Sequence, residues 1–193
     1  MDLTKPEVSV DLDDLPLVSV VIPSYNQGNY IEQTLRSIFL QGYPRLECIV
    51  MDGGSTDGTI EVLKKYDPWI TYWKSEKDGG QSAAINEGFD RATGDLIGWQ
   101  NSDDYYCPNA FHLVAAAFQQ HPGVDGFFGD KDCIDQDGKV YHQVIAQEPT
   151  QLNMIPWPCF PSEALFFRKG VIQKGYRINE EFRHYLDYEF FWR

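Results

Sequence analysis

The feature that most constrains the fold is a regular alternation of short apolar strands and amphipathic helices between residues 17 and 129. Strands are predicted at 17–23, 46–51, 70–75, 95–100 and 126–129, and helices at 30–40, 59–66, 82–92 and 108–120. The strand segments are mostly apolar, several of them rich in β-branched residues, and the helical segments place apolar residues three or four positions apart. Strands that alternate with helices at this pace predict an α/β domain with a mostly parallel central sheet.

The alternation ends near residue 130. Residues 135–138 (DQDG) are typical of a hairpin turn, and the proline-rich stretch 148–162 is predicted to be a loop. A late strand is expected at 163–168, and a last helix begins near Asp187. We therefore expect an acidic leader at 1–16 and one domain at 17–193. Because the chain stops inside the last helix, this domain is expected to be shortened at its C-terminus.

Composition excludes some classes of function. The formal net charge is −13, and no basic stripe offsets it, which argues against a nucleic-acid partner. The sequence holds no apolar run long enough to cross a membrane and no signal-peptide pattern, so a cytoplasmic location is expected. The four cysteines form no CxxC pair or zinc-ligand spacing.

Polar segments follow four of the predicted strands. They are residues 23–26 (PSYN), 52–57 (DGGSTD), 76–81 (EKDGGQ) and 101–104 (NSDD). In open parallel α/β sheets, ligands bind beyond the carboxyl ends of the strands. Because three of the four segments carry carboxylates, we expect a polar site along this edge of the sheet.

Asp103 and Asp104 are adjacent carboxylates directly after a buried strand. Adjacent carboxylates repel each other unless a cation or solvent lies between them. Their oxygens suit Mg²⁺ or Mn²⁺, which would accept phosphate oxygens as further ligands. Capping of the following helix explains the pair equally well at this point.

Three other features each allow two interpretations. Asp52, followed by two glycines, fits contact with a nucleobase or ribose, and it fits a plain strand-to-helix turn as well. The pair Gly79 and Gly80 offers backbone N–H groups to an anion, but a lone Gly-Gly is weak evidence. Asp187 among aromatic residues fits a general base, or a carboxylate that the helix dipole favours at a helix start.

Taken in order, several segments resemble the family 2 glycosyltransferases, which have the GT-A fold. They are VSVVIPSYN (18–26), IVMDGGSTD (49–57), SEKDGGQ (75–81), AINEG (84–88), ATGD (92–95), WQNSDD (99–104), LFFR (165–168) and DYE (187–189). The resemblance covers about residues 17–193. Each segment alone is modest, but their succession in this order is specific.

The resemblance implies a role for each matching residue. On the nucleotide side, Pro23, Ser24 and Tyr25 line the pocket and Asp52 binds the base. Asp78 and Gln81 lie near the diphosphate or donor sugar, and Asp103 faces the ribose or sugar. Asp104 ligates Mn²⁺ or Mg²⁺, and Asp187 deprotonates the acceptor hydroxyl. The implied reaction is a single inverting displacement that moves a sugar from a nucleotide-diphospho-sugar, with UDP as the expected nucleotide.

The resemblance also suggests a setting: a carbohydrate or lipid-linked acceptor, surface polysaccharide synthesis, and peripheral association with the inner face of the membrane. The chain departs from the family pattern at Ser102, where the DxD motif begins with Asp, and in the few residues after Asp187. The alternative is a domain that binds nucleotide-sugar without transferring it, or a non-catalytic partner subunit. A sugar-1-phosphate nucleotidyltransferase is disfavoured, because residues 23–28 hold no basic residue.

Overall fold

The computed structural model describes residues 14–148, 150, 161–182 and 184–193. Its main sheet has six strands in the order β3-β2-β1-β4-β8-β5. They are β3 (Tyr72–Ser75), β2 (Leu46–Asp52), β1 (Val18–Ser24), β4 (Leu96–Trp99), β8 (Leu165–Arg168) and β5 (Gly126–Phe128). A separate hairpin joins β6 (Lys131–Ile134) to β7 (Val140–Val144).

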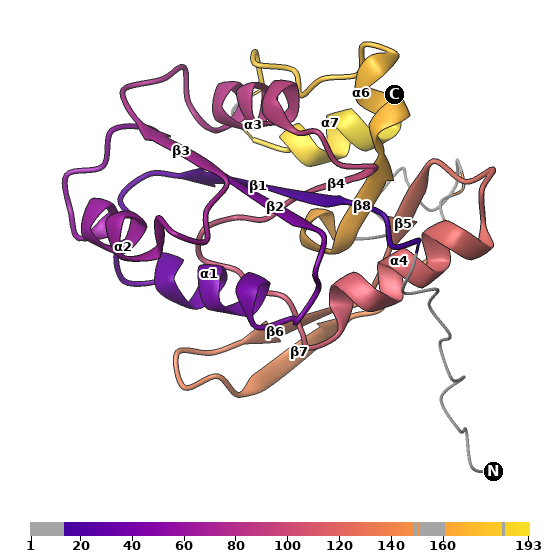
Figure 1. Cartoon of the computed structure of the whole chain (residues 1–193), viewed down its shortest axis with the longest axis horizontal. Coiled ribbons are helices and arrows are strands. Elements are labelled where there is room, and N and C mark those ends of the chain that lie inside the picture. The colour runs from indigo at the N-terminus through magenta and orange to yellow at the C-terminus, as the bar shows by residue number, and fades with distance from the viewer. Residues whose placement is uncertain (1–13, 149, 151–160, 183) are drawn as a thin grey trace.

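Helices cover both faces of this sheet (Figure 1). They are α1 (Ile31–Phe39), α2 (Thr59–Tyr66) and α4 (Ala110–Gln120) on one face, and α3 (Gln81–Arg91), α6 (Lys169–Gln173) and α7 (Leu186–Trp192) on the other. The predicted α/β class with a mostly parallel sheet is confirmed, because β1 pairs in parallel with β2 and β4, and β2 pairs in parallel with β3.

The buried central strand β1 contributes side chains to the hydrophobic cores on both faces of the sheet. Its side chains alternate between the faces of the sheet, as strand geometry requires. Val20 and Ile22 pack with α1 and α4, whereas Val21 packs with α3 and α7. Burial on both faces explains why this strand is almost continuously apolar.

Strand β8 runs against the others. It pairs antiparallel with both β4 and β5. Phe166 of β8 lies between Gly98 of β4 on one side and Phe127 of β5 on the other. An antiparallel strand starts where its parallel neighbours end. The short 3₁₀ helix η1 (Ser162–Ala164), which precedes β8, therefore lies at the carboxyl edge of the sheet.

Most predicted elements differ from the observed ones by only one or two residues at their ends, which is the usual uncertainty of helix and strand limits. The helix predicted at 108–120 begins two residues later, at Ala110, because Asn109 before it adopts a left-handed conformation. The 135–138 turn is confirmed between β6 and β7, with Gly138 at φ 78°. The predicted loop at 148–162 lies mostly outside the described residues.

The end of the expected leader packs against the domain, whereas residues 1–13 lie outside the described part of the chain. Leu15 is buried in the core. The Tyr43 hydroxyl donates to the Pro16 carbonyl at 2.6 Å, and Arg45 donates to the Leu15 carbonyl. Within the described ranges, no helix is long and apolar enough to span a bilayer.

Candidate active site

A cavity of about 1000 Å³ opens at the carboxyl ends of β1 to β4, and we call it the strand-end pocket. Its walls come from all four polar segments that the sequence singled out. The predicted site residues that line it are Pro23, Ser24, Tyr25, Asp78, Gln81 and Asp103. The structure thus brings together residues from across 80 positions of sequence, as the parallel topology predicts.

Asp52 lies beneath this pocket and does not line it, with 1% of its surface exposed. Its carboxylate accepts hydrogen bonds from the backbone N–H groups of Gly54 and Ser55 and from the hydroxyls of Ser55 and Ser75. Gly54 adopts a φ of 83°, which favours glycine. Asp52 therefore holds the loop after β2 in shape, and the glycines above it form the pocket floor.

The loops after β1 and β2 are tied to each other. Asn26 donates its backbone N–H to the Ser55 hydroxyl and accepts from the backbone N–H of Thr56. Asp57 accepts from the backbone N–H of Gly28 at 2.9 Å. Hydrogen bonds from Thr59 and Gly28 lower the pKa of Asp57 below its ordinary value. These cross-links fix one wall of the pocket without help from a ligand.

The opposite wall joins α3 to the loop after β4. Gln81 donates its side-chain amide to the Asn101 side-chain oxygen at 3.0 Å. Asp78 accepts the backbone N–H of Gly80 at 2.8 Å, just before the helix begins, and its carboxylate lies across the pocket next to Gly53. Both predicted residues of the third polar segment therefore face the pocket from the N-terminal end of α3.

The acidic turn 101–104 is held from below by α1. The Thr34 hydroxyl contacts the carbonyl oxygens of Ser102 and Asp104 at 3.0 and 2.7 Å. Asn101 donates its side-chain amide to the Asp104 carboxylate at 3.1 Å. Asp103 is exposed and borders the strand-end pocket, whereas Asp104 is half-buried and faces a second cavity.

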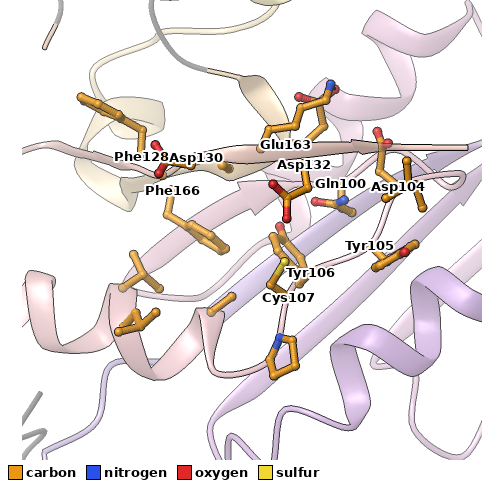
Figure 2. A pocket seen from close by; sticks show the side chains of 18 of the residues that line it. Gln100, Asp104, Tyr105, Tyr106, Cys107, Phe128, Asp130, Asp132, Glu163 and Phe166 are labelled. Atoms are coloured by element: carbon orange, nitrogen blue, oxygen red, sulfur yellow. The ribbon is translucent and has the colours of Figure 1, made fainter. Parts of the chain in front are cut away.

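This second cavity, the hairpin pocket, measures about 560 Å³ and lies among α4, β5 and the β6–β7 hairpin. Asp103 borders both cavities, so it marks their junction. Figure 2 shows Gln100, Asp104 and Glu163 grouped at one end, away from Phe128. The acidic end of the hairpin pocket thus adjoins the strand-end pocket.

Burial raises the pKa of Asp104, and the neighbouring carboxylates of Glu163 and Asp103 raise it further. Lys131 opposes this effect and forms an ion pair with Glu163 at 2.9 Å. A carboxylate that is desolvated beside other carboxylates is stabilised when a cation binds. Hard oxygen ligands on consecutive residues suit Mg²⁺ or Mn²⁺ with phosphate oxygens in the remaining positions.

Asp103 and Asp104 supply too few oxygen ligands to hold such an ion alone, so oxygens of a bound substrate would have to complete the coordination. Among the described residues, no three His, Cys, Asp or Glu side chains are grouped so as to hold a metal by themselves. Mg²⁺ is commonly bound by one or two carboxylates plus substrate phosphates rather than by an all-protein cage. Asp103 and Asp104 match that pattern.

Glu163 and Lys131 were not predicted as site residues. Glu163 was assigned to the late strand, but it lies in η1, at the edge where β8 starts. The signal that would have found it is strand direction, because an antiparallel β8 carries its preceding residues to the carboxyl end of β4. Sequence periodicity reveals a strand but not its direction.

Asp187 lies in the first turn of α7 and is half-buried, as the sequence predicts for a helix start. It lines neither the strand-end pocket nor the hairpin pocket. The helix packs through Phe190 against Phe89 and Trp99. Asp187 is therefore the one predicted acidic site residue on α7, and it is not among the residues that line either cavity.

Comparisons with known proteins find relatives in sequence and in fold. The chain is 31% identical over 190 residues to the chondroitin synthase of Pasteurella multocida, covering 92% of this chain and 18% of that one. It superposes on the structure of S. aureus TarS 1–349 in complex with UDP with a TM-score of 0.73, at 24% identity, over 90% of this chain and 53% of that one.

A third similar protein is the mannosyltransferase PcManGT of Pyrobaculum calidifontis, whose structure is in complex with GDP-Man and Mn²⁺. The TM-score is 0.62 at 22% identity, over 93% of this chain and 52% of that one. The chain spans about half the length of these solved structures, and less of the synthase. At these identities the structural likeness establishes the GT-A fold.

The family model for glycosyl transferase family 2 matches residues 19–179, which include every polar strand end described above. The chain belongs to glycosyltransferase family 2.

Proposed function

We propose that this chain carries the donor half of an inverting, metal-dependent glycosyltransferase that uses a UDP-sugar. The observation that carries the proposal is the strand-end pocket, which gathers six predicted donor-site residues and ends at the acidic turn 101–104. The similar TarS structure contains UDP, which supports this choice of nucleotide.

The nucleoside occupies the end of the pocket formed by Pro23, Ser24 and Tyr25 in this proposal. The Ser24 hydroxyl is buried and has no hydrogen-bond partner among the described residues. Buried polar groups are nearly always paired, so a bound nucleotide or water would satisfy it. Gln81 and Asp103 lie at the other end, where the ribose, diphosphate and sugar extend toward β4.

Asp104, with Asp103 beside it, would hold Mn²⁺ or Mg²⁺ against the diphosphate. The ion would neutralise the charge that develops on the departing UDP. The pKa of Asp104 is raised first by burial and then by the neighbouring carboxylates of Glu163 and Asp103, which supports a site that a cation would stabilise. The PcManGT complex with Mn²⁺ supports a divalent ion in this fold.

The acceptor hydroxyl attacks the anomeric carbon, and the bond from this carbon to the diphosphate oxygen breaks. Asp187 acts as the general base and accepts the proton of the hydroxyl. The acceptor is a growing carbohydrate or a lipid-linked saccharide of a surface polysaccharide. A synthase of such a polymer is among the similar proteins. The proposed setting is the cytoplasm, at the inner face of the membrane.

A second candidate function is a domain that binds the nucleotide-sugar without transferring it. The position of Asp187 favours this candidate, because it borders neither described cavity. The two functions share the donor site and differ in turnover. Release of UDP from a UDP-sugar by wild type, abolished in Asp187→Asn, would distinguish the transferase from the binding domain.

Calorimetric titration of UDP with and without Mn²⁺ tests the shared donor site. We expect Mn²⁺-dependent binding to the wild type and loss of that dependence in Asp104→Ala. Asp132→Ala is the matched control, because Asp132 also faces the hairpin pocket but is bound to Gln143. Binding of GDP or dTDP but not UDP to the folded wild type would overturn the choice of nucleotide, and binding of none of the three would refute the donor site.

A further inference from the structure

The strand-end pocket needs a group that recognises the nucleobase, and Asp52 is badly placed for that task. Its two oxygens already accept four hydrogen bonds from its own loop and from Ser75. A base could reach them only by breaking this buried arrangement, which would leave donors unpaired at a considerable cost. The residue that faces the pocket at this strand end is Gly53.

The carboxylate of Asp78 occupies the space next to Gly53. A Cβ atom built on Gly53 would lie 3.3 Å from both carboxylate oxygens of Asp78 and 3.4 Å from the ring of Tyr25. The absence of a side chain at Gly53 therefore lets the Asp78 carboxylate approach the end of β2. Asp78, Gly53 and Tyr25 form one corner of the pocket.

This corner lies away from the acidic turn. Asp78 follows β3, and β2 and β1 separate that strand from β4, which leads to Asp103. A carboxylate beside the diphosphate would repel it. The placement of Asp78 against the floor at Gly53 avoids this conflict and puts it at the nucleoside end.

We propose, building on the donor site proposed above, that Asp78 is the residue that selects the nucleobase. One oxygen accepts the N–H of Gly80, and the other accepts no hydrogen bond from the described residues. That oxygen accepts a hydrogen bond from the imide N–H of uracil. The ring of Tyr25, which is 62% exposed, stacks on the base. Cytosine presents a lone pair at the same ring position, so the carboxylate repels it.

Asp78→Asn tests the inference with little change in shape. The asparagine oxygen keeps the contact with Gly80, and its NH₂ group replaces the imide acceptor with a donor. We expect wild type to prefer UDP over CDP by about tenfold or more, since the bond is to a charged group. In Asp78→Asn, UDP and CDP should bind about equally, or CDP should bind more tightly. Calorimetry in the presence of Mn²⁺ measures both affinities.

Two further variants separate base selection from other effects. Glu76→Gln removes a nearby exposed carboxylate that is paired with Lys74, and it should keep the UDP preference. Tyr25→Leu should weaken UDP and CDP equally, because stacking does not distinguish the two pyrimidines. Thermal unfolding of each variant checks that it is folded.

The outcomes distinguish this inference from the proposed function. If wild type prefers UDP and folded Asp78→Asn keeps the same ratio, Asp78 does not read the base, and the donor site stands. An equal affinity of wild type for UDP and CDP also overturns the inference. If wild type binds neither UDP nor CDP, the inference fails, and the titrations with GDP and dTDP decide whether the donor site fails with it.

Discussion

Asp52 and Asp78 carry the same carboxylate at neighbouring strand ends, but their surroundings give them different tasks. Asp52 is buried and accepts hydrogen bonds from two backbone N–H groups and two hydroxyls. Asp78 is half-buried, accepts one bond from Gly80 and faces the pocket. Burial and hydrogen bonding thus assign Asp52 to the architecture of the loop and leave Asp78 available to a ligand.

Removal of Asp52 should therefore cost stability. In Asp52→Ala the N–H groups of Gly54 and Ser55 lose a charged acceptor, and we expect the free energy of unfolding to fall by about 3 kcal/mol. Asp78→Ala is the comparison, with a loss of less than about 1 kcal/mol because it removes one partly exposed hydrogen bond. Urea unfolding at neutral pH measures both. Equal losses would show that Asp52 does not hold the loop.

Asp57 gives the cross-link between the first two loops a pH dependence. Hydrogen bonds from Thr59 and Gly28 lower its pKa in the folded chain, so its contribution is present above the unfolded pKa of about 3.9. That contribution is lost as pH falls through the lower folded pKa. Asp57→Asn should be less stable than wild type at pH 7, and urea unfolding should show the difference narrowing below about pH 4. A difference that stays constant with pH would contradict this account.

At the scale of elements, α3 positions one wall of the strand-end pocket because it lies unusually close to β1. A Cβ atom on Gly88 would come within 2.2 Å of Val21 Cγ1 in the buried centre of the sheet. Only a residue without a side chain allows this approach. The position of Gln81 at the N-terminal end of the same helix depends on it.

Gly88→Ala should therefore destabilise the chain by about 1–3 kcal/mol, because the overpacking outweighs the gain in helix propensity of about 1 kcal/mol. Gly170→Ala in α6 is the matched control, since a Cβ atom there meets nothing within 4 Å. We expect it to be neutral or slightly stabilising in thermal and urea unfolding. A Gly88→Ala variant as stable as wild type would mean that α3 shifts freely on the sheet.

The sequence predicted these elements well where local chemistry decides them. The β-branched run of β1 and the apolar spacing of α1 specify strand and helix without long-range information. The place of β8 between β4 and β5 could not be predicted, because insertion and direction depend on contacts across about 70 residues of chain. Glu163 was missed for the same reason.

At the scale of the whole molecule, the parallel sheet creates the site by aligning four chain segments at one edge. This is why six predicted donor-site residues lie together in the strand-end pocket. The partition of Asp103 and Asp104 between two cavities could not be foreseen, since it depends on how α4 and the hairpin close over the turn. The position of Asp187 depends likewise on the packing of α7.

The central claim is that a nucleotide binds in the strand-end pocket. The most direct test is the affinity for UDP, with Mn²⁺ present, of Gly53→Val, whose side chain would fill the space between Asp78 and Tyr25. Gly123→Val is the control, because a Cβ atom there meets nothing within 4 Å and the residue lies outside the pocket. We predict that wild type and Gly123→Val bind UDP alike and that folded Gly53→Val does not. Undiminished binding to Gly53→Val would place the nucleotide elsewhere and contradict the account.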